Sequence, residues 1–549
     1  MTGLSHEELI QFHPERLLLH EVIIRITAEI AIVESDEEAD LGITFRQIAD
    51  KILNTYIQPN MDEIRDSYQA MHKQARSAIE KELQDSLFNL NVATNNHKTP
   101  LLKRIWPFAS TKKVKATRPP LSQQEREFEI ISGFKEKGLN AENALSSAVY
   151  RSLSRVLGAI ANQRGYLGKD IALLTKLSTR HVCYYYGSHL IGEMVHPLIF
   201  QAIVEQQYPE LPDADEAILI SLKGTSAAGK SSLRPRLRQI MAKIGIENNG
   251  YATISPDIWR RMLLDYESLG DAYKYAGTLA GDEVPIIDHK LDLYISQKAK
   301  QGKLSHLLVD RFRFDSFAAG SSAKEGSNLL TRFGHTIYMV FVVTPPEETV
   351  ERSWKRGLQV GRFKAVDDLL DHNIEALKGI PVLFFTWALR KDKLVYCEFL
   401  DNSVDFGKQP KTIAFGFKDE LYILDIKCMI DINRFSKLNI YAESANQVYP
   451  FASAIAPEVN TEFLVKCAND IPRINFVDRV TSKIYACIES GAISWVDHVI
   501  FARVWEDHNN RIGLLAIAPN LIKGLSQVPN QPAKQISTEA TRHTMGNLS

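Results

Sequence analysis

The sequence predicts an α/β core, a parallel sheet with helices on both faces, flanked by a helical N-terminal region and an α+β C-terminal region. Three stretches that differ in the spacing of their apolar residues support this prediction. Before about residue 207 the apolar residues recur at helical steps. From Ala217 short apolar runs alternate with longer polar helical stretches, which is the pattern of a parallel sheet covered by helices. After about Pro381 the apolar runs are close-set and joined by short turns, which indicates an antiparallel sheet.

The composition narrows the class of protein. The chain has 549 residues, of which 45% are hydrophobic, and this is enough for more than one domain. Its 65 Lys and Arg nearly cancel its 66 Asp and Glu, so the overall charge gives no reason to expect wholesale nucleic-acid binding. Five cysteines without a CxxC pair indicate reduced thiols. No apolar run approaches the roughly 20 residues of a membrane helix, and the first residues lack a signal-peptide pattern. We therefore expect a cytoplasmic protein without a transmembrane segment, and export by a signal-less route stays open.

The first part of the chain predicts helices and one basic segment. Apolar residues recur without an interrupting Gly or Pro, which predicts one long amphipathic helix, at Ile64, Tyr68, Met71, Ala75, Ile79, Leu83 and Leu87. Residues 98–118 then carry seven Lys or Arg and no acid. This segment reads either as an exposed linker or, with Trp106 and Phe108, as a contact for an anionic membrane or nucleic acid.

These patterns predict the strands of two regions and divide the chain into six segments. The expected strands of the α/β domain are AILISLK, YATI, HLLV and IYMVFVV, and those of the next region are KLVYCEFL, KTIAFGF and LYILDI. The segments are a helical domain (1–97), a basic proline-containing linker (98–122), a second helical region (123–207), the α/β domain (208–390), an α+β region (391–526) and a polar, disordered tail (527–549).

Residues 224–231 read GTSAAGKS and match the pattern G-x-x-x-x-G-K-[ST] in full. An expected strand runs into the motif and an expected helix runs out of it. Glycines let backbone N–H groups turn around an oxyanion, and the positive end of the following helix faces the phosphates. The motif therefore predicts binding of ATP with Mg²⁺, in which Lys230 reaches the β- and γ-phosphates and Ser231 ligates the metal. The residues expected to bind the nucleotide are Gly224, Thr225, Ser226, Ala227, Ala228, Gly229, Lys230, Ser231 and Ser232.

Two acids follow expected strands of the same domain. Two residues separate YATI from Asp257, so Asp257 lies at the carboxyl end of the sheet, where a carboxylate can accept the proton of an acceptor hydroxyl. Asp310 ends HLLVD and can hold Mg²⁺ through water. Either acid could instead only cap the turn or helix that it begins.

Three arginines follow the fourth expected strand. Arg352 and Arg356 share a helix face, and Arg362 follows in a glycine-containing loop. We expect at least one of them to contact the transferring phosphate. The chain lacks a guanine-specific N-K-x-D and an LSGGQ-like signature. These absences favour a kinase over a GTPase switch or a transporter ATPase.

Residues 217–380 resemble the zeta-toxin family of P-loop kinases. The resemblance rests, in chain order, on GTSAAGKSSLR, on ISPDIWRRML, on IIDHKLDLYISQKAKQG leading into HLLVDRFR, and on ERSWKRGLQVGRF. It implies ATP-dependent phosphorylation of a hydroxyl. The best-known acceptor of that family is the sugar nucleotide UDP-N-acetylglucosamine, and the resemblance also implies a separate inhibitory protein partner.

The resemblance also implies roles for single residues. Lys230 and Ser231 would bind nucleotide and metal, and Asp257 would be the base. Asp292 stands where the family has a substrate-binding glutamate, and Arg313, after Asp310, falls in a substrate-binding segment. The family's two phosphate-stabilising arginines correspond to Arg352 and Arg362.

Three functions remain in competition on the sequence alone. The leading one is a kinase that phosphorylates a hydroxyl of a small-molecule acceptor. The second is a nucleotide-gated interaction protein without an acceptor, which would keep its output when Asp257 is lost. The third is a polynucleotide kinase or nucleic-acid-linked ATPase that uses residues 98–118, and its binding would fall steeply with salt.

Overall fold

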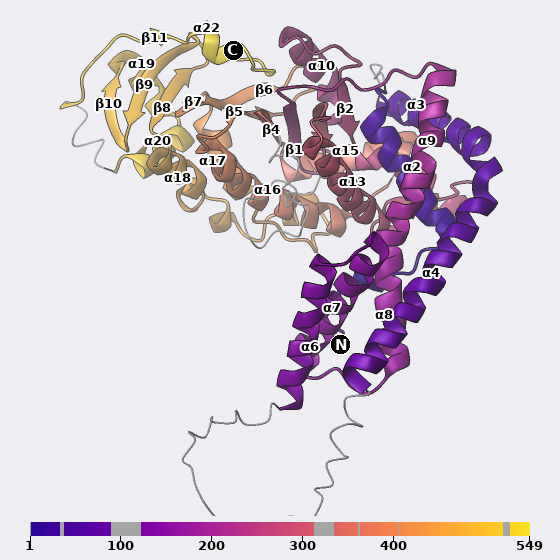
Figure 1. The fold of residues 1–549 in the computed structure, drawn as a ribbon. Coiled ribbons are helices and arrows are strands. Elements are labelled where there is room, and N and C mark those ends of the chain that lie inside the picture. Colours follow the sequence, from indigo (N-terminus) through magenta and orange to yellow (C-terminus); the bar gives the residue numbers. More distant parts are fainter. Residues whose placement is uncertain are drawn as a thin grey trace, which may run out of the picture. The chain divides into compact units, whose positions relative to one another are not determined.

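The computed structural model describes residues 2–32, 38–88, 122–311, 334–360, 363–405, 407–519 and 527–548 (Figure 1). They form two compact units. The first unit comprises Met1–Arg25 and Ala49–Gln206, and the second comprises Ile26–Ile48 and Gln207–Ser549. Helices α2 (Pro14–Glu29) and α3 (Glu38–Lys51) each contribute residues to both units.

The first unit is helical in its described residues. The apolar stripe of α4 (Met61–Leu83) is buried, which confirms the long amphipathic helix, but the α-helix ends at Leu83 and continues as the π-helical turn η3 (Gln84–Phe88). Its other elements are α1 (His6–Leu9), η1 (Ile52–Ile57), η2 (Gln58–Asn60), α6 (Gln123–Leu139), α7 (Ala144–Arg164), α8 (Ile171–Val182), η4 (Cys183–Gly187) and α9 (Ser188–Gln206).

The second unit is built on one large mixed sheet. Its first five strands are parallel and lie in the order β2-β3-β1-β4-β5: β1 (Ile218–Gly224), β2 (Tyr251–Ile254), β3 (His306–Asp310), β4 (Thr336–Val343) and β5 (Leu394–Asp401). The sheet continues beyond β5 through β6 (Lys411–Phe417), β7 (Glu420–Ile423), β8 (Arg473–Asp478), β9 (Lys483–Glu489) and β10 (Ala492–Val496), with β11 (Lys534–Gln535) paired to β9.

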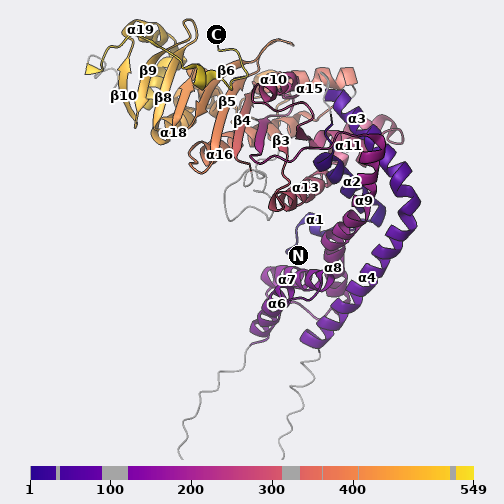
Figure 2. The same cartoon turned by 45° about the horizontal axis from the view of Figure 1, so that its top comes forward.

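Helices cover both faces of this sheet (Figure 2). Leu237 and Met241 of α10 pack with Val340 of β4 on one face. The next residue of β4, Phe341, points to the opposite face and contacts Phe384 of α16, with ring centroids 6.4 Å apart. The helices of the unit are α10 (Arg234–Lys243), α11 (Arg260–Leu263), α12 (Ala276–Leu279), α13 (Glu283–Lys300), α15 (Pro346–Val360), α16 (Val366–Ala388), α17 (Ile426–Arg434), α18 (Glu462–Asp470), α19 (His498–Glu506), α20 (His508–Ile517) and α22 (Thr538–Thr541).

The structure differs from the expected boundary near residue 390. Strand β5 pairs in parallel with β4 along its whole length, from Thr336↔Leu394 to Val343↔Asp401. The strands of 391–526 therefore extend the sheet of the α/β domain instead of forming a separate one. The extension is also mixed, because β7 and β8 are parallel whereas the other pairs beyond β5 are antiparallel.

The C-terminal segment also differs from the expected disordered tail. The backbone N–H groups of Met545 and Gly546 donate to the buried carboxylate of Glu398, at 2.8 and 3.0 Å. The side chain of Met545 is 5% exposed and belongs to the core beneath α10. The polar composition of the segment gave no sign of this, because backbone groups make the anchoring bonds.

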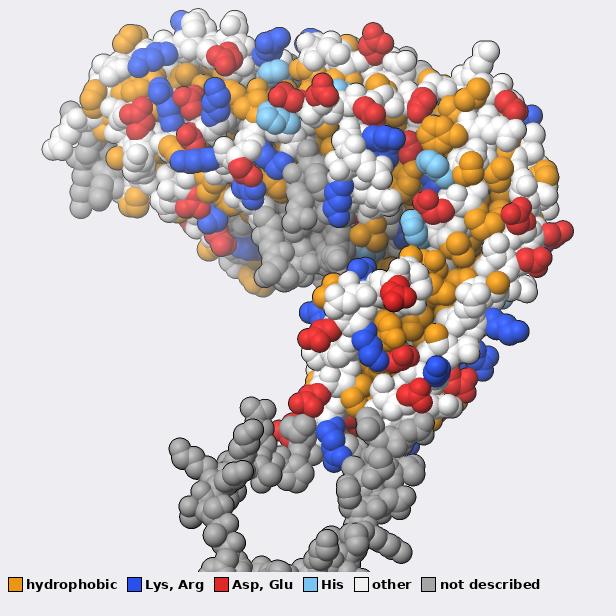
Figure 3. All heavy atoms as spheres, in the orientation of Figure 1, with side chains coloured by type: hydrophobic (Ala, Val, Ile, Leu, Met, Phe, Trp, Pro, Cys, Tyr) orange, Lys and Arg blue, Asp and Glu red, His pale blue; other side chains and the backbone are white. Residues whose placement is uncertain are grey.

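Charged side chains of both signs are interspersed on the face drawn in Figure 3, in keeping with the balanced composition. Within the described residues, no helix combines the length and the hydropathy needed to cross a membrane.

Candidate functional site

The loop after β1 is the centre of the candidate site. It turns through two left-handed residues, Ala227 with φ 59° and Gly229 with φ 85°. A Cβ on Gly224 would lie 2.8 Å from the carbonyl oxygen of Val342 on β4, and a Cβ on Gly229 would lie 2.2 Å from Nδ2 of Asn402. Close packing therefore requires both glycines of the motif, and at Gly229 the left-handed backbone conformation requires glycine as well.

One carbonyl group fixes this loop to the neighbouring strands. The oxygen of Ala228 accepts hydrogen bonds from Asn402 Nδ2 at 2.7 Å and from Thr344 Oγ1 at 3.2 Å. Thr344 follows β4 directly and Asn402 follows β5 directly, so the carboxyl ends of two parallel strands hold the loop. Sequence reasoning missed Asn402, because β5 was assigned to a different sheet.

Arg352 reaches the same point from α15. Its Nη2 donates to the carbonyl oxygen of Asn402 at 2.6 Å and to Glu348 Oε2 at 3.0 Å, and its Nη1 lies 3.5 Å from the oxygen of Ala228. The structure therefore brings this predicted arginine to the loop. Two of the other predicted arginines, Arg362 and Arg313, lie outside the described residues.

The side chain of Lys230 bends back to the first two residues of the loop. Its Nζ donates to the carbonyl oxygens of Gly224 at 3.1 Å and of Thr225 at 3.0 Å. Ser231 begins the 3₁₀ turn η5 (Ser231–Leu233), which runs into α10, and Ser232 Oγ donates to the oxygen of Gly229 at 2.7 Å. The loop thus combines a fixed ammonium group with the positive end of a helix, a combination suited to an oxyanion.

Asp310 lies beside the loop at the end of β3 and is contacted by Arg234 of α10. Arg234, in the first turn of α10, donates through Nη2 to Asp310 Oδ2 at 3.3 Å and to Ser255 Oγ at 3.2 Å. Asp310 also stands opposite Leu222 in the pairing of β3 with β1, two residues before the loop. A partly buried carboxylate at this position is a suitable oxygen donor for a divalent cation.

Two further cations lie buried under this edge of the sheet. Arg311 is 1% exposed, and it pairs with Asp288 through Nε and with Asp292 through Nη1, each at 2.7 Å. Lys223 Nζ donates to the carbonyl oxygen of Arg311 at 3.0 Å. Burial, reinforced by the nearby Arg311, lowers the pKa of Lys223 to about 7. The carboxylate of Asp292, expected to bind substrate, therefore lies in a buried ion pair that fixes the residue after Asp310.

Asp257 occupies a separate cluster beyond β2. Its carboxylate accepts a hydrogen bond from Arg260 Nε at 3.0 Å, and its side chain is 46% exposed. Lys364, just before α16, is near enough for Asp257 to oppose the burial that lowers the pKa of this lysine to about 8. Since β3 separates β2 from β1, and strands are spaced by about 4.8 Å, the end of β2 lies roughly 10 Å from the loop.

Comparison with known proteins adds little to this geometry. No protein-family model matches the sequence, and no curated protein matches it. Among solved structures, the chain is similar to one from the PezAT chromosomal toxin–antitoxin system of the human pathogen Streptococcus pneumoniae, at 15% sequence identity and a TM-score of 0.24. The similarity covers 35% of this chain and 70% of that chain. At this TM-score it carries no argument for fold or function.

Proposed function

We propose that this protein is an ATP- and Mg²⁺-dependent kinase that transfers the γ-phosphate of ATP to a hydroxyl group of a small molecule. The observation that carries the proposal is the loop at 224–231, held at the carboxyl end of β1 with Lys230 across its mouth. In the sheet order, β1 lies between β3 and β4, where the chain switches from one side of the sheet to the other. Ligands of open α/β sheets bind at such a switch point.

The residues at the loop fit the proposed ligands. The left-handed turn at Ala227 and Gly229 orients backbone N–H groups around a phosphate, and Lys230 adds a positive charge. Ser231 and Asp310 supply the oxygen ligands that Mg²⁺ prefers, and the metal would offset negative charge on the β- and γ-phosphates. Arg352, fixed by Asn402, is placed to neutralise charge on the transferring group.

Asp257 is the proposed general base. The roughly 10 Å between the end of β2 and the loop leaves room for a γ-phosphate and an acceptor hydroxyl between them. Arg260, which pairs with Asp257, orients the carboxylate that accepts the hydroxyl proton as the phosphate is transferred.

The acceptor is proposed at the level of its class. The family resemblance implies a sugar nucleotide such as UDP-N-acetylglucosamine, with Asp292 and Arg313 in its binding segment. The burial of Asp292 against Arg311 supports an indirect role, in which Asp292 positions Arg311 at the end of β3. An inhibitory protein partner is part of the same proposal and rests on the resemblance alone.

Transfer of labelled phosphate tests the proposal. The protein is incubated with γ-labelled ATP, Mg²⁺ and a soluble metabolite extract, and the products are separated and identified by mass spectrometry. We expect label in a small molecule, at least 100-fold less of it with Asp257→Asn, and no change with Asp215→Asn, an exposed acid before the amino end of β1. Equal transfer by Asp257→Asn and wild type would refute the assigned base. ATP binding without any labelled acceptor would instead favour the nucleotide-gated interaction protein.

A further inference from the structure

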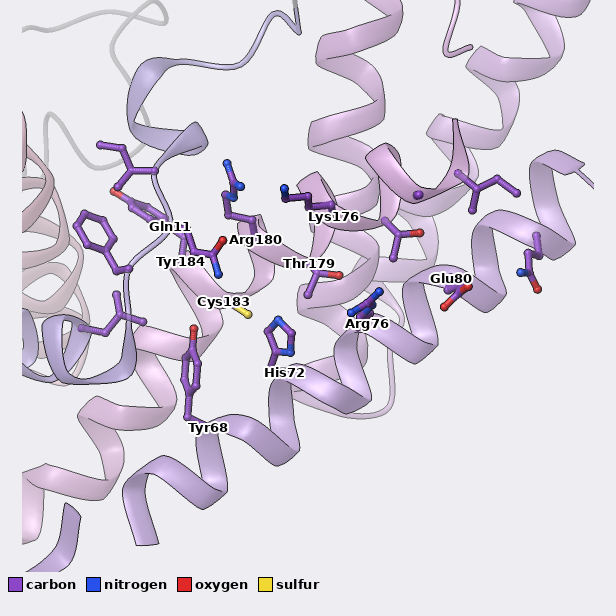
Figure 4. A pocket seen from close by; sticks show the side chains of 17 residues that line it. Gln11, Tyr68, His72, Arg76, Glu80, Lys176, Thr179, Arg180, Cys183 and Tyr184 are labelled. Atoms are coloured by element: carbon purple, nitrogen blue, oxygen red, sulfur yellow. The ribbon is translucent and has the colours of Figure 1, made fainter. Parts of the chain in front are cut away.

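The helical unit contains a cavity of about 660 Å³, lined by α4, by α8 with η4, and by the segment before α2 (Figure 4). Ligand pockets commonly have about 300–1,000 Å³, so the cavity has the size of a small-molecule site. All of its lining residues belong to the first unit. It is therefore separate from the loop at 224–231.

The inner wall of the cavity is apolar and aromatic. Leu17, Tyr68, Cys183 and Tyr184 are buried, and the rings of Phe12 and Tyr184 lie 6.2 Å apart. Cys183 and Tyr184 belong to the π-helical turn η4, a rare conformation that often occurs at functional sites. This wall can take up the apolar body of a ligand.

The opposite end of the cavity is cationic. Arg76 of α4 and Lys176 of α8 line it, with Arg180 one turn nearer Tyr184, against the single carboxylate of Glu80 among the lining residues. Arg180 is held by a bond from Nη1 to the carbonyl oxygen of Leu9, at 2.5 Å. Arg76 and Lys176 are exposed, and neither forms an ion pair with a described residue. Burial and the nearby Arg76 lower the pKa of His72, so this ring is neutral at pH 7 and leaves the excess of positive charge to the three cations.

Two buried hydroxyl groups of α8 also line the cavity. Thr175 and Thr179 are one turn apart on α8 and are 5% and 4% exposed. Neither hydroxyl has a hydrogen-bond partner among the described residues. A buried hydroxyl without a partner costs about 1–3 kcal/mol, so an occupant with acceptor oxygens would remove a cost that the empty cavity carries.

We propose that this cavity binds a small amphipathic anion, with its apolar body against Tyr68 and Tyr184 and its carboxylate or phosphate head between Arg76 and Lys176. The pairing of an apolar wall with a cationic end selects against neutral and cationic molecules of the same shape. The two threonine hydroxyls, after rotation about χ1, donate to the head group or to an adjacent oxygen of the ligand.

Calorimetric titration of the full chain with four probes of equal chain length tests the proposal: octanoate, octyl phosphate, octanol and octylamine. We expect the two anions to bind at least tenfold more tightly than octanol and octylamine. The comparison of octanoate with octyl phosphate shows which head group the site prefers. Equal affinity for octanoate and octylamine, or binding of none of the four probes, would overturn the proposal.

Variants locate the binding. The double substitution Arg76→Gln with Lys176→Gln changes exposed side chains, so the fold is kept, and we expect it to lower octanoate affinity roughly tenfold or more while leaving octanol unaffected. Lys73→Gln, an exposed lysine of α4 outside the cavity lining, is the matched control and should bind octanoate like wild type. An equal loss in Lys73→Gln, or no loss in the double variant, would contradict the assigned site. Thr179→Val, which keeps the volume, should cost a smaller, few-fold factor.

Discussion

Replacing Gly229 by alanine tests the packing of the loop most sharply. Gly229 has φ 85°, and a Cβ there would lie 2.2 Å from Asn402 Nδ2. No non-bonded pair tolerates this distance, so the asparagine side chain must move. Its movement breaks the bond from Asn402 to the oxygen of Ala228, which fastens the loop to β5.

The magnitude follows from two contributions. An alanine in the left-handed region costs about 1 kcal/mol relative to glycine, and the lost hydrogen bond costs about 1 kcal/mol more. The free loop can relax to relieve these costs, and ATP binding would have to restore the original loop. We therefore expect Gly229→Ala to weaken ATP binding by up to about 2 kcal/mol, or roughly 30-fold.

Calorimetric titration with Mg-ATP measures this effect, and Gly245→Ala is the control. Gly245 has φ 88° but nothing within 4 Å of its Cβ position, so alanine there adds backbone strain without a clash. We expect Gly245→Ala to lose about 1 kcal/mol of stability and to bind ATP like wild type. Adding Asn402→Ala to Gly229→Ala should cost less than the sum of the two single changes, because the clash is gone. Wild-type affinity in Gly229→Ala would refute the reasoning.

Three further predictions concern stability. Asp292→Asn should lower the free energy of unfolding by up to about 3 kcal/mol in urea titration, because it removes one of two carboxylates from the buried Arg311; a change confined to the KM for the acceptor would instead favour direct substrate binding. Lys223 has a pKa of about 7 in the folded state against an ordinary value of 10.5, so between these two pH values the unfolded state binds one more proton than the folded state and wild-type stability should rise with pH. Lys223→Met removes this dependence, and it should therefore stabilise the protein most at and below pH 7, where the buried lysine is charged. An equally steep rise of stability with pH in Lys223→Met would contradict the assignment. Deleting residues 543–549 should lower the thermal midpoint by several degrees, because Glu398 would lose two backbone donors; an unchanged midpoint would show that the segment is dispensable.

The sequence predicted the loop better than its surroundings. The motif at 224–231 specifies a local backbone conformation, so its residues predict the turn without knowledge of the fold. The side chains that hydrogen-bond to this turn come from residues that follow distant strands. Asn402 was missed because no local pattern reveals that β5 pairs with β4. Arg352 was predicted to contact the transferring phosphate from its place after the fourth strand, and the structure places its guanidinium group at the carbonyl oxygens of Ala228 and Asn402.

The partners of buried charged groups were harder to predict from the sequence than the positions of those groups along the chain. Asp288 and Asp292 are four residues apart, so a shared partner on one helix face was foreseeable, but the identity of that partner, Arg311, depends on how α13 packs against β3. The C-terminal segment shows the same limit. Its order depends on backbone donors that meet the buried Glu398, which composition does not encode.

The fate of each phosphate of ATP tests the central claim most directly. The protein is incubated with Mg²⁺ and the acceptor-containing extract in parallel reactions, one with ATP labelled in the γ-phosphate and one with ATP labelled in the α-phosphate. A kinase built on Lys230, Asp257 and Arg352 predicts γ-label in the acceptor and all α-label in ADP, with neither transfer in Lys230→Ala. Label from the α-phosphate in the acceptor, or γ-label found only in free phosphate, would contradict it.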